Sequence, residues 1–443
     1  MRQADVILFV EHVARELDIA CVIRHLAWQR FGMEVSVASL TQGLEQTLRG
    51  APPGVIAVPY FYSRRDMGIR EILMRWPGVR VVNLAYEQLV SPGNQQFKIP
   101  RDPIAREHVL HLAAGDFFRD FLIRNGVPGD RVLMTGSLAC SLYLMPYRRY
   151  FESQRARMAD QYGLELNRPW VFFPENYGAA FFSDREVARR VREGCNRGDV
   201  EEYRRSSRDS LAQVAHWCRE AALREDVEII VRPRPATSVE TLREAFREAA
   251  GELPPTRLHF IKQESVRQWT LACDTVVSSF STTLVEAAVA DRPAYLLMPA
   301  PLPRSMHCAW HDLAPKITTS GDFQRLLREG PSPFATSLLR QWAQLELLSY
   351  GDPISKVAAI LAAAVGRDCH LPPVPSAPVL DRMRLQWRKS RRQLKQRLLA
   401  SPRYAAPNPC ESPDAFDPHD VDERTVAWEQ TLDLPSRDLR ACA

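Results

Sequence analysis

The sequence has no long hydrophobic run. The apolar stretch Val6–Val10 is followed at once by Glu11, His12 and Arg15, so it is too short for a signal-peptide core. No other stretch approaches the roughly 18 apolar residues of a membrane span. We therefore expect a cytoplasmic protein.

Cysteine pairs with the spacing of a metal site or a disulfide framework are also absent. The nine cysteines are an odd number, scattered along the chain without a CxxC pair, and we interpret them as reduced packing residues. The local cluster of His307, Trp310, His311 and Asp312 offers no third ligand at a recognisable spacing. We expect no metal and no bound cofactor.

The excess of positive charge is confined to one segment, and the rest of the chain is close to neutral. The formal net charge is +5, and the segment from Arg382 to Arg397 alone holds eight Lys and Arg residues and no acid. Nucleic-acid binding would need a basic surface on the folded domains themselves, so we expect no nucleic-acid partner.

The length and the alternation of elements predict two α/β domains. The 443 residues exceed what one core usually organises. Short apolar runs alternate with amphipathic helices, one of them expected around Pro103 to Ala114, and this alternation predicts parallel sheets facing a cleft. We expect Rossmann-like domains at 1–146 and 169–366, a linker at 147–168 and a tail at 367–443.

Polar residues follow several predicted strands. Ligands of open parallel sheets bind beyond the carboxyl ends of the strands. The segments that follow strands are Glu11-His12, Tyr86-Glu87-Gln88, Glu175-Asn176-Tyr177 and Arg232-Pro233-Arg234-Pro235.

The segment from Ser278 to Ala288 combines a hydroxyl-rich turn with the start of a helix. Its candidate nucleotide-binding residues are Ser279, Ser281, Thr282, Thr283 and Glu286. The first N–H groups of a helix have no intrahelical partner and favour an anion, and a carboxylate one turn further can accept ribose hydroxyls. Ordinary N-capping is the alternative.

Arg232 and Arg234 alternate with prolines at the end of a strand. Arginine forks suit phosphate oxygens, so we expect both side chains to hold phosphate. Two solvated arginines in an exposed loop are the alternative.

Glu87, Glu11 and His12 are the candidate catalytic residues. A carboxylate or an imidazole there could accept the proton of an attacking hydroxyl. The alternatives are that either glutamate pairs with Arg15, itself a candidate substrate-binding residue, or caps a helix, and that His12 is structural.

Glu175, Asn176 and Tyr177 are candidates for contacting the sugar or the transferring group. Plain loop chemistry is their alternative.

The C-terminal region changes character after Leu371, where a Pro-rich linker begins. Within residues 380–399, apolar residues form one helical stripe flanked by basic residues, the pattern of an interfacial membrane helix. A nucleic-acid contact, a protein contact or a solvated helix are the alternatives. The Pro- and Asp-rich remainder, Ser401 to Ala443, is predicted to be disordered.

Several segments together resemble the bacterial surface carbohydrate biosynthesis proteins. They are Glu11 to Asp18, Asn83 to Gln88, Gly115 to Leu122, Thr135 to Ser137, Arg232 to Pro235 and Ser278 to Ala288. That group is similar to GT-B glycosyltransferases and, more distantly, to capsule Kdo transferases and the CDP-glycerol glycerophosphotransferases. The resemblance covers about residues 5 to 300.

The resemblance implies a GT-B fold of two Rossmann-like domains. The nucleotide would be held by the C-terminal domain and the acceptor by the N-terminal one, usually without a divalent metal. Relatives usually carry His-Pro where this chain has Arg234-Pro235, and arginine can hold phosphate but cannot act as a base.

These observations predict a metal-independent glycosyltransferase that is cytoplasmic and sits at the inner face of the plasma membrane. It would move a sugar, or a related group, from a nucleotide sugar to a glycan or glycolipid acceptor in surface polysaccharide biosynthesis. A nucleotide-sugar epimerase of the same fold and a degenerate scaffold in a polysaccharide assembly complex remain the alternatives.

Overall fold

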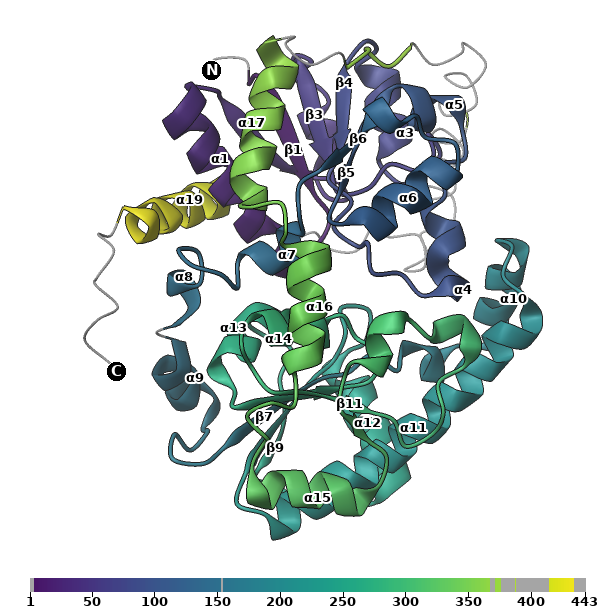
Figure 1. Ribbon diagram of the computed structural model, residues 1–443, viewed down its shortest axis with the longest axis vertical. Helices are drawn as coiled ribbons and strands as arrows, with labels where there is room; N and C mark the ends of the chain where they lie inside the picture. The colour runs from purple at the N-terminus through teal and green to yellow at the C-terminus, as the bar shows by residue number, and fades with distance from the viewer. Residues whose placement is uncertain (1–3, 153, 367–370, 376–386, 388–413, 434–443) are drawn as a thin grey trace, which may run out of the picture. The chain divides into compact units, whose positions relative to one another are not determined.

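A computed structural model describes residues 4–152, 154–366, 371–375, 387 and 414–433 (Figure 1). The chain divides into two compact units. The first consists of Met1–Gln88, Ile99–Ala139 and Tyr350–Ala443, and the second of Leu89–Lys98 and Cys140–Ser349. Residues 350–366, predicted to lie in the second domain, therefore belong to the first unit.

The first unit is built on a parallel sheet of six strands in the order β2-β1-β3-β4-β5-β6. The strands are β1 (Val6–Val10), β2 (Val35–Ser39), β3 (Val55–Val58), β4 (Arg80–Asn83), β5 (Val109–Ala113) and β6 (Val132–Met134). The strand order reverses between β1 and β3, because β2 pairs with one side of β1 and β3 with the other.

Helices cover both faces of this sheet. They are η1 (Val13–Leu17), α1 (Asp18–Phe31), α2 (Leu44–Thr47), α3 (Ile69–Arg75), α5 (Pro103–Glu107), α6 (Asp116–Arg124), η3 (Gly129–Arg131), α17 (Pro353–Gly366) and α19 (Pro418–Leu432), with α7 (Leu138–Ser141) at the unit boundary. α1 packs against α17 and α19. Ile72 of α3 and Trp76, the residue that follows this helix, are buried in the core with Phe9.

The predicted helix around Pro103 to Ala114 is wrong for its second half. The helix α5, capped by Asp102, ends at Glu107, and Val109–Ala113 form the buried strand β5. The polar residue that hid this strand is His111, which is fully buried because Asn83 and the Ala105 carbonyl satisfy its ring nitrogens.

The second unit contains another parallel sheet of six strands, in the order β12-β11-β10-β7-β8-β9. The strands are β7 (Trp170–Pro174), β8 (Glu228–Arg232), β9 (Leu258–Phe260), β10 (Thr275–Ser278), β11 (Ala294–Leu297) and β12 (Lys316–Ile317). The order reverses between β7 and β10. The two all-parallel sheets confirm the predicted α/β class.

The second unit also has helices on both faces of its sheet. They are α4 (Pro92–Gln95), η2 (Gln96–Lys98), α8 (Arg149–Glu152), α9 (Gln154–Tyr162), η4 (Gly178–Phe181), α10 (Asp184–Arg192), α11 (Arg197–Arg224), α12 (Val239–Ala250), α13 (Val266–Ala272), α14 (Thr283–Val289), η5 (Arg304–Met306), η6 (Ala309–Asp312), α15 (Ser320–Glu329) and α16 (Ser337–Leu347). α8 and α9 occupy most of the segment expected to be a linker.

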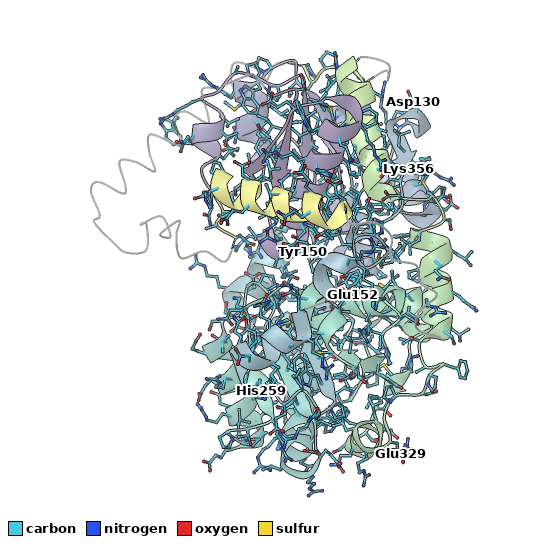
Figure 2. All side chains as sticks on the ribbon, turned by 90° about the vertical axis from the view of Figure 1, so that its left-hand side faces the viewer. Asp130, Tyr150, Glu152, His259, Glu329 and Lys356 are labelled. Atoms are coloured by element: carbon cyan, nitrogen blue, oxygen red, sulfur yellow. The ribbon has the colours of Figure 1, made fainter. Side chains whose placement is uncertain are left out.

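The prediction of disorder beyond Ser401 is wrong for residues 418–432, which form α19. Asp417 caps this helix, Pro418 stands at its first position, and Trp428 is fully buried against the first unit. α19, drawn in yellow in Figure 2, packs against α1. The predicted basic helix at 380–399 lies outside the described residues except for Trp387. Among the described helices, none is long and apolar enough to span a bilayer.

Candidate functional site

In the second unit, the loops after β7 and β10 meet at the point where the strand order reverses. Ser278 ends β10, and its hydroxyl donates a 2.6 Å hydrogen bond to the carbonyl oxygen of Pro174 at the end of β7. Open α/β sheets bind their ligands at such a switch point, outside the carboxyl ends of the strands. The predicted residues Glu175 and Ser279 immediately follow these two strand ends.

Glu175 is a carboxylate buried without full pairing. Its side chain is 3% exposed, and its Oε2 atom has no hydrogen-bond partner among the described residues. Burial raises the pKa of Glu175 to about 7, although the charge of Arg234 and the backbone N–H of Tyr177 oppose the rise. Near neutral pH this group can therefore donate or accept a proton.

Two hydroxyl groups beside Glu175 are also buried without partners. Ser279 is 0% and Tyr177 2% exposed, and among the described residues neither hydroxyl oxygen has a hydrogen-bond partner. The Tyr177 ring packs edge-on against Phe173 and Phe280, so the ring is part of the core. Buried polar groups are nearly always satisfied, so these unpaired atoms in the segments after β7 and β10 make the switch point a candidate ligand site.

Arg234 lies directly over the backbone of Gly178, the first residue of η4. A Cβ atom placed on Gly178 would come within 1.5 Å of the guanidinium Nη1 atom and 2.6 Å of Cζ. The guanidinium group is half-buried and near Glu175. Glycine at position 178 is thus what allows the arginine to lie here.

Arg232 is placed differently from Arg234. It is the last residue of β8, is 7% exposed, and its guanidinium donates to the Glu264 carbonyl oxygen at 3.1 and 3.3 Å. Burial lowers the pKa of Arg232 to about 10. These contacts make it a support for the loop that contains Glu264, and its predicted phosphate contact stays a prediction.

The hydroxyl turn before α14 is organised by Ser281. The Ser281 hydroxyl donates to Thr283 Oγ1 at 3.0 Å and accepts from the Thr283 backbone N–H at 3.3 Å. Thr282, the residue before the helix, makes no side-chain capping bond. Part of the turn is therefore capped locally, as the alternative interpretation held.

Glu286, the candidate ribose ligand on α14, is held by a residue that the sequence analysis did not identify. Tyr143 donates its hydroxyl to Glu286 Oε2 at 2.8 Å. Tyr143 is 1% exposed, and burial followed by the charge of Glu286 raises its pKa, so it remains a donor. This bond fixes the orientation of the carboxylate.

We expect Tyr143→Phe to weaken nucleotide binding about 3- to 10-fold, or about 1 kcal/mol, because the Glu286 carboxylate loses the hydrogen bond that fixes its orientation. Titration calorimetry with the tightest-binding nucleotide measures this. The control is Tyr295→Phe on β11, whose hydroxyl accepts from the Ser332 backbone N–H. An equal loss in the control would contradict the role of Tyr143.

In the first unit, the candidate residues lie at the reversal between β1 and β3. Glu11 follows β1, and its Oε1 atom accepts a 3.4 Å hydrogen bond from Tyr60, which follows β3. The carboxylate of Glu16, 1% exposed, accepts the backbone N–H groups of Glu11 and His12 at 2.7 and 3.3 Å. Glu16 thereby holds the turn between β1 and η1.

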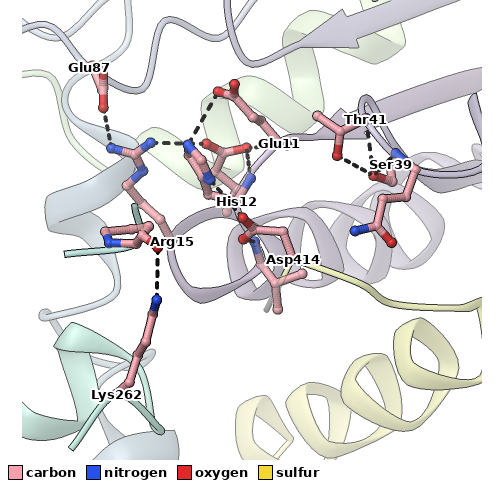
Figure 3. Close-up of polar contacts among 12 residues, drawn as sticks. Glu11, His12, Arg15, Ser39, Thr41, Glu87, Lys262 and Asp414 are labelled. Carbon is pink, nitrogen blue, oxygen red and sulfur yellow. Dashed lines mark hydrogen bonds and ion pairs between the residues drawn. The ribbon is translucent and has the colours of Figure 1, made fainter. Parts of the chain in front are cut away.

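His12 and Arg15 each have a carboxylate partner (Figure 3). His12 Nδ1 is 3.2 Å from Asp414 Oδ2, and Arg15 pairs with Glu87. Arg15 also lies 3.6 Å from Glu16. The structure thus brings together Glu11, His12, Arg15 and Glu87, and the predicted pairing of Arg15 with a glutamate is present.

The remaining candidates add little to either group. Asn176 is partly exposed in the loop between β7 and η4. No cluster of three or more His, Cys, Asp or Glu side chains within the described ranges could hold a metal ion. The sequence analysis did not identify Asp414, Tyr60 or Tyr143, because their hydrogen-bond partners are far away in sequence. The one signal in the sequence near Asp414 is the capping pattern of the helix that follows it.

Comparisons with known proteins give matches of fold. No protein-family model matches the chain, and no curated protein matches it. The chain is similar to the wall teichoic acid polymerase TagF, in a structure of a variant soaked with CDPG, with 9% identity, a TM-score of 0.52, and coverage of 83% of this chain and 90% of the other.

Two other structures match this chain over almost their whole length. Staphylococcus aureus MnaA with UDP has 12% identity and a TM-score of 0.51 over 83% of this chain and 98% of the other. A Listeria monocytogenes protein assigned as a UDP-N-acetylglucosamine 2-epimerase has 11% identity and a TM-score of 0.51 over 85% and 100%. These similarities confirm the predicted GT-B fold and, at the level of fold, the resemblance to surface carbohydrate biosynthesis proteins.

Proposed function

We propose that this chain is a GT-B glycosyltransferase that moves a sugar, or a related group, from a nucleotide-activated donor to an acceptor in bacterial surface polysaccharide biosynthesis. The observation that supports it best is the set of buried, unpartnered polar atoms at the switch point of the second unit: Glu175 Oε2, Tyr177 Oη and Ser279 Oγ. A ligand with several polar oxygens would satisfy them.

The donor would be held by the second unit. Arg234 supplies a positive charge for the diphosphate, and the turn from Ser279 to Thr283 supplies hydroxyl and N–H donors. Glu286, oriented by Tyr143, accepts the ribose hydroxyls. The positive charge and the donors would stabilise the leaving nucleoside diphosphate, the task that a metal ion performs in other enzymes.

The acceptor would be held by the first unit. Arg15 and Glu87 form an ion pair that could bind acceptor hydroxyls, and Glu11 and His12 supply groups that can accept a proton. We further propose a cytoplasmic protein at the inner face of the plasma membrane, with residues 380–399 as the contact to lipid.

A nucleotide-sugar epimerase is the second candidate. Support for it comes from the similarity to the Listeria protein assigned as an epimerase, whose whole length is covered. The two activities differ in their products, because an epimerase changes one sugar stereocentre and leaves the nucleotide attached.

Titration calorimetry with UDP, CMP, CDP and GDP tests the proposal first. We expect one base to bind clearly, and binding of none would contradict both enzymatic functions and favour a scaffold. The corresponding nucleotide sugars are then incubated with the protein. Release of the free nucleotide on addition of a glycan acceptor supports transfer, and interconversion without release supports epimerisation.

Glu175 predicts a pH dependence of donor binding. With a pKa of about 7, its protonated fraction rises from about one tenth at pH 8 to about nine tenths at pH 6. The neutral acid can donate to a phosphate oxygen, whereas the carboxylate repels it. We expect about tenfold tighter binding of a nucleotide sugar at pH 6 than at pH 8.

The nucleotide sugar is the suitable probe because its diphosphate diester does not titrate between these pH values. Glu175→Gln should remove most of the difference, and Glu193→Gln, on an exposed helix end, should preserve it. A pH dependence that survives in the Glu175→Gln variant would assign the effect to another group.

A further inference from the structure

The end of the chain contributes a carboxylate to the candidate acceptor site of the first unit. Asp414 precedes α19 and spans the start of η1: its Oδ1 accepts the backbone N–H of Val13 at 3.0 Å, and its Oδ2 lies 3.2 Å from His12 Nδ1. Both oxygens are thus used on two neighbouring residues of the turn after β1, and the carboxylate has a defined position relative to the imidazole ring.

The docking of α19 explains why Asp414 stays there. Arg424 pairs with Asp18 at 2.9 Å, Trp428 Nε1 donates to Asp18 Oδ1 at 3.3 Å, and Arg24 pairs with Asp422 at 2.7 Å. The Asp18 carboxylate is 3% exposed. A helix held by a buried carboxylate and a buried Trp428 is a firm anchor for the residue that precedes it.

We propose that Asp414 and His12 form a dyad in which Asp414 keeps the proton on Nδ1 and leaves Nε2 as the base for the acceptor hydroxyl. Glu11 Oε2 lies 3.6 Å from Nε2, which is beyond hydrogen-bond distance. The His12 side chain is 30% exposed. Because Asp414 occupies Nδ1, this partly exposed ring has Nε2 left for a substrate, and this inference rests on the proposed function.

The other two candidate bases each have one carboxylate oxygen in a contact. Arg15 holds Oε1 of Glu87, and Glu11 Oε1 accepts from Tyr60. Glu11 is well placed for a different task, because its Oε2 atom faces the nitrogen that would become protonated. It can stabilise the imidazolium through its negative charge.

The charged groups around His12 act in both directions. Burial lowers the pKa of His12, as does Arg15, but the hydrogen bond to Asp414 and the carboxylates of Glu11 and Glu16 outweigh them and raise it overall. The groups facing the ring are therefore Asp414 from the segment before α19, and Glu11, Arg15 and Glu16 from β1–η1. Tyr60 and Glu87 act through Glu11 and Arg15.

In the step proposed for this dyad, Nε2 takes the proton of the acceptor hydroxyl while the hydroxyl oxygen forms a bond to the anomeric carbon of the donor. The bond from that carbon to the diphosphate oxygen breaks, and the nucleoside diphosphate leaves with the electron pair. The proton remains on the imidazolium until solvent takes it. Asp414 acts only through His12 and is a positioning residue.

Nuclear magnetic resonance of the full chain with isotopically labelled histidine tests the dyad without any substrate. Asp414→Asn keeps an acceptor but removes the charge, and we expect the titration midpoint of His12 to fall by about one pH unit. Asp414→Ala removes both, so the midpoint should fall and the neutral ring should lose its preference for a proton on Nδ1. Glu423→Gln, an exposed carboxylate on the same helix, is the matched control.

An unchanged midpoint and tautomer in both Asp414 variants would overturn the proposal. Once the nucleotide panel has identified a donor, the pH profile of kcat/KM can be measured. Its acid limb should move to lower pH in Asp414→Asn by the same amount, because a weaker base stays deprotonated down to a lower pH. An unmoved acid limb would overturn the role of His12 as the base. Absence of transfer from every donor, with the dyad intact by resonance, would instead overturn the proposed function.

Discussion

Replacing Arg234 with alanine is expected to weaken binding of the nucleotide sugar by about 10- to 100-fold, because hydrogen bonds to a charged group contribute about 1.5–3 kcal/mol. Arg234 also lowers the pKa of buried Glu175. Its removal should raise that pKa further and keep Glu175 neutral near pH 7, so the expected loss comes from the missing phosphate contact and not from repulsion by Glu175.

Gly178→Ala tests whether the position of the Arg234 side chain matters when its charge is kept. The new methyl group would fall within 1.5 Å of the guanidinium Nη1 atom, so the side chain must move although its charge stays. We expect a loss of affinity close to that of Arg234→Ala. Arg205→Ala, which removes a charge from an exposed position of α11, serves as the control in titration calorimetry.

Each possible result for the Arg234→Ala and Gly178→Ala variants bears on the phosphate site. Weak binding by both variants supports a fixed guanidinium as the phosphate ligand. Unchanged binding by Arg234→Ala contradicts that role and leaves the turn from Ser279 to Thr283 as the phosphate site. Loss of binding by the Arg205→Ala control would indicate a general effect of net charge, which added salt would reduce.

Replacing Trp428 with alanine is expected to lower the free energy of unfolding by about 3–5 kcal/mol, the usual range for truncating a buried aromatic side chain. Trp428 is 0% exposed, and its indole N–H donates to the buried Asp18 carboxylate. The substitution therefore removes apolar contacts and a hydrogen bond to a charged group at once.

Trp28→Ala is the matched control, since Trp28 lies on α1 with 61% of its surface exposed. Exposed substitutions usually change stability by less than about 0.5 kcal/mol. Urea unfolding of both variants measures the difference. Equally small effects of the two substitutions would contradict the packing of α19 on the rest of the first unit, because truncating Trp428 would then remove no buried contacts.

The sequence was sufficient to predict the parts of the fold that depend on local patterns. The buried strands β1, β7 and β10 are short apolar runs, and each is followed by the polar residues that the switch-point rule selects. β5 was missed because a histidine interrupts its apolar pattern, and only the partners of His111 make that residue acceptable in a core.

For the segment after Ser401, amino-acid composition gave a wrong prediction, whereas the local capping pattern indicates the helix that forms there. The segment after Ser401 is rich in proline and aspartate, yet Asp417 and Pro418 form a helix start and Val421 and Trp428 are spaced to face one side. The pairs Asp414–His12 and Tyr143–Glu286 could not be predicted from spacing, because each joins segments that only the complete fold brings together.

The return of α19 to the first unit also sets an order of events during synthesis. His12 and Asp414 are 402 residues apart, so the ribosome has made both sheets before the partner of His12 exists. Until then, the face of α1 that carries Asp18 and Cys21 is not packed against α19. The strands of the first unit can pair early, but the protonation site of His12 is fixed only when the last described helix has docked.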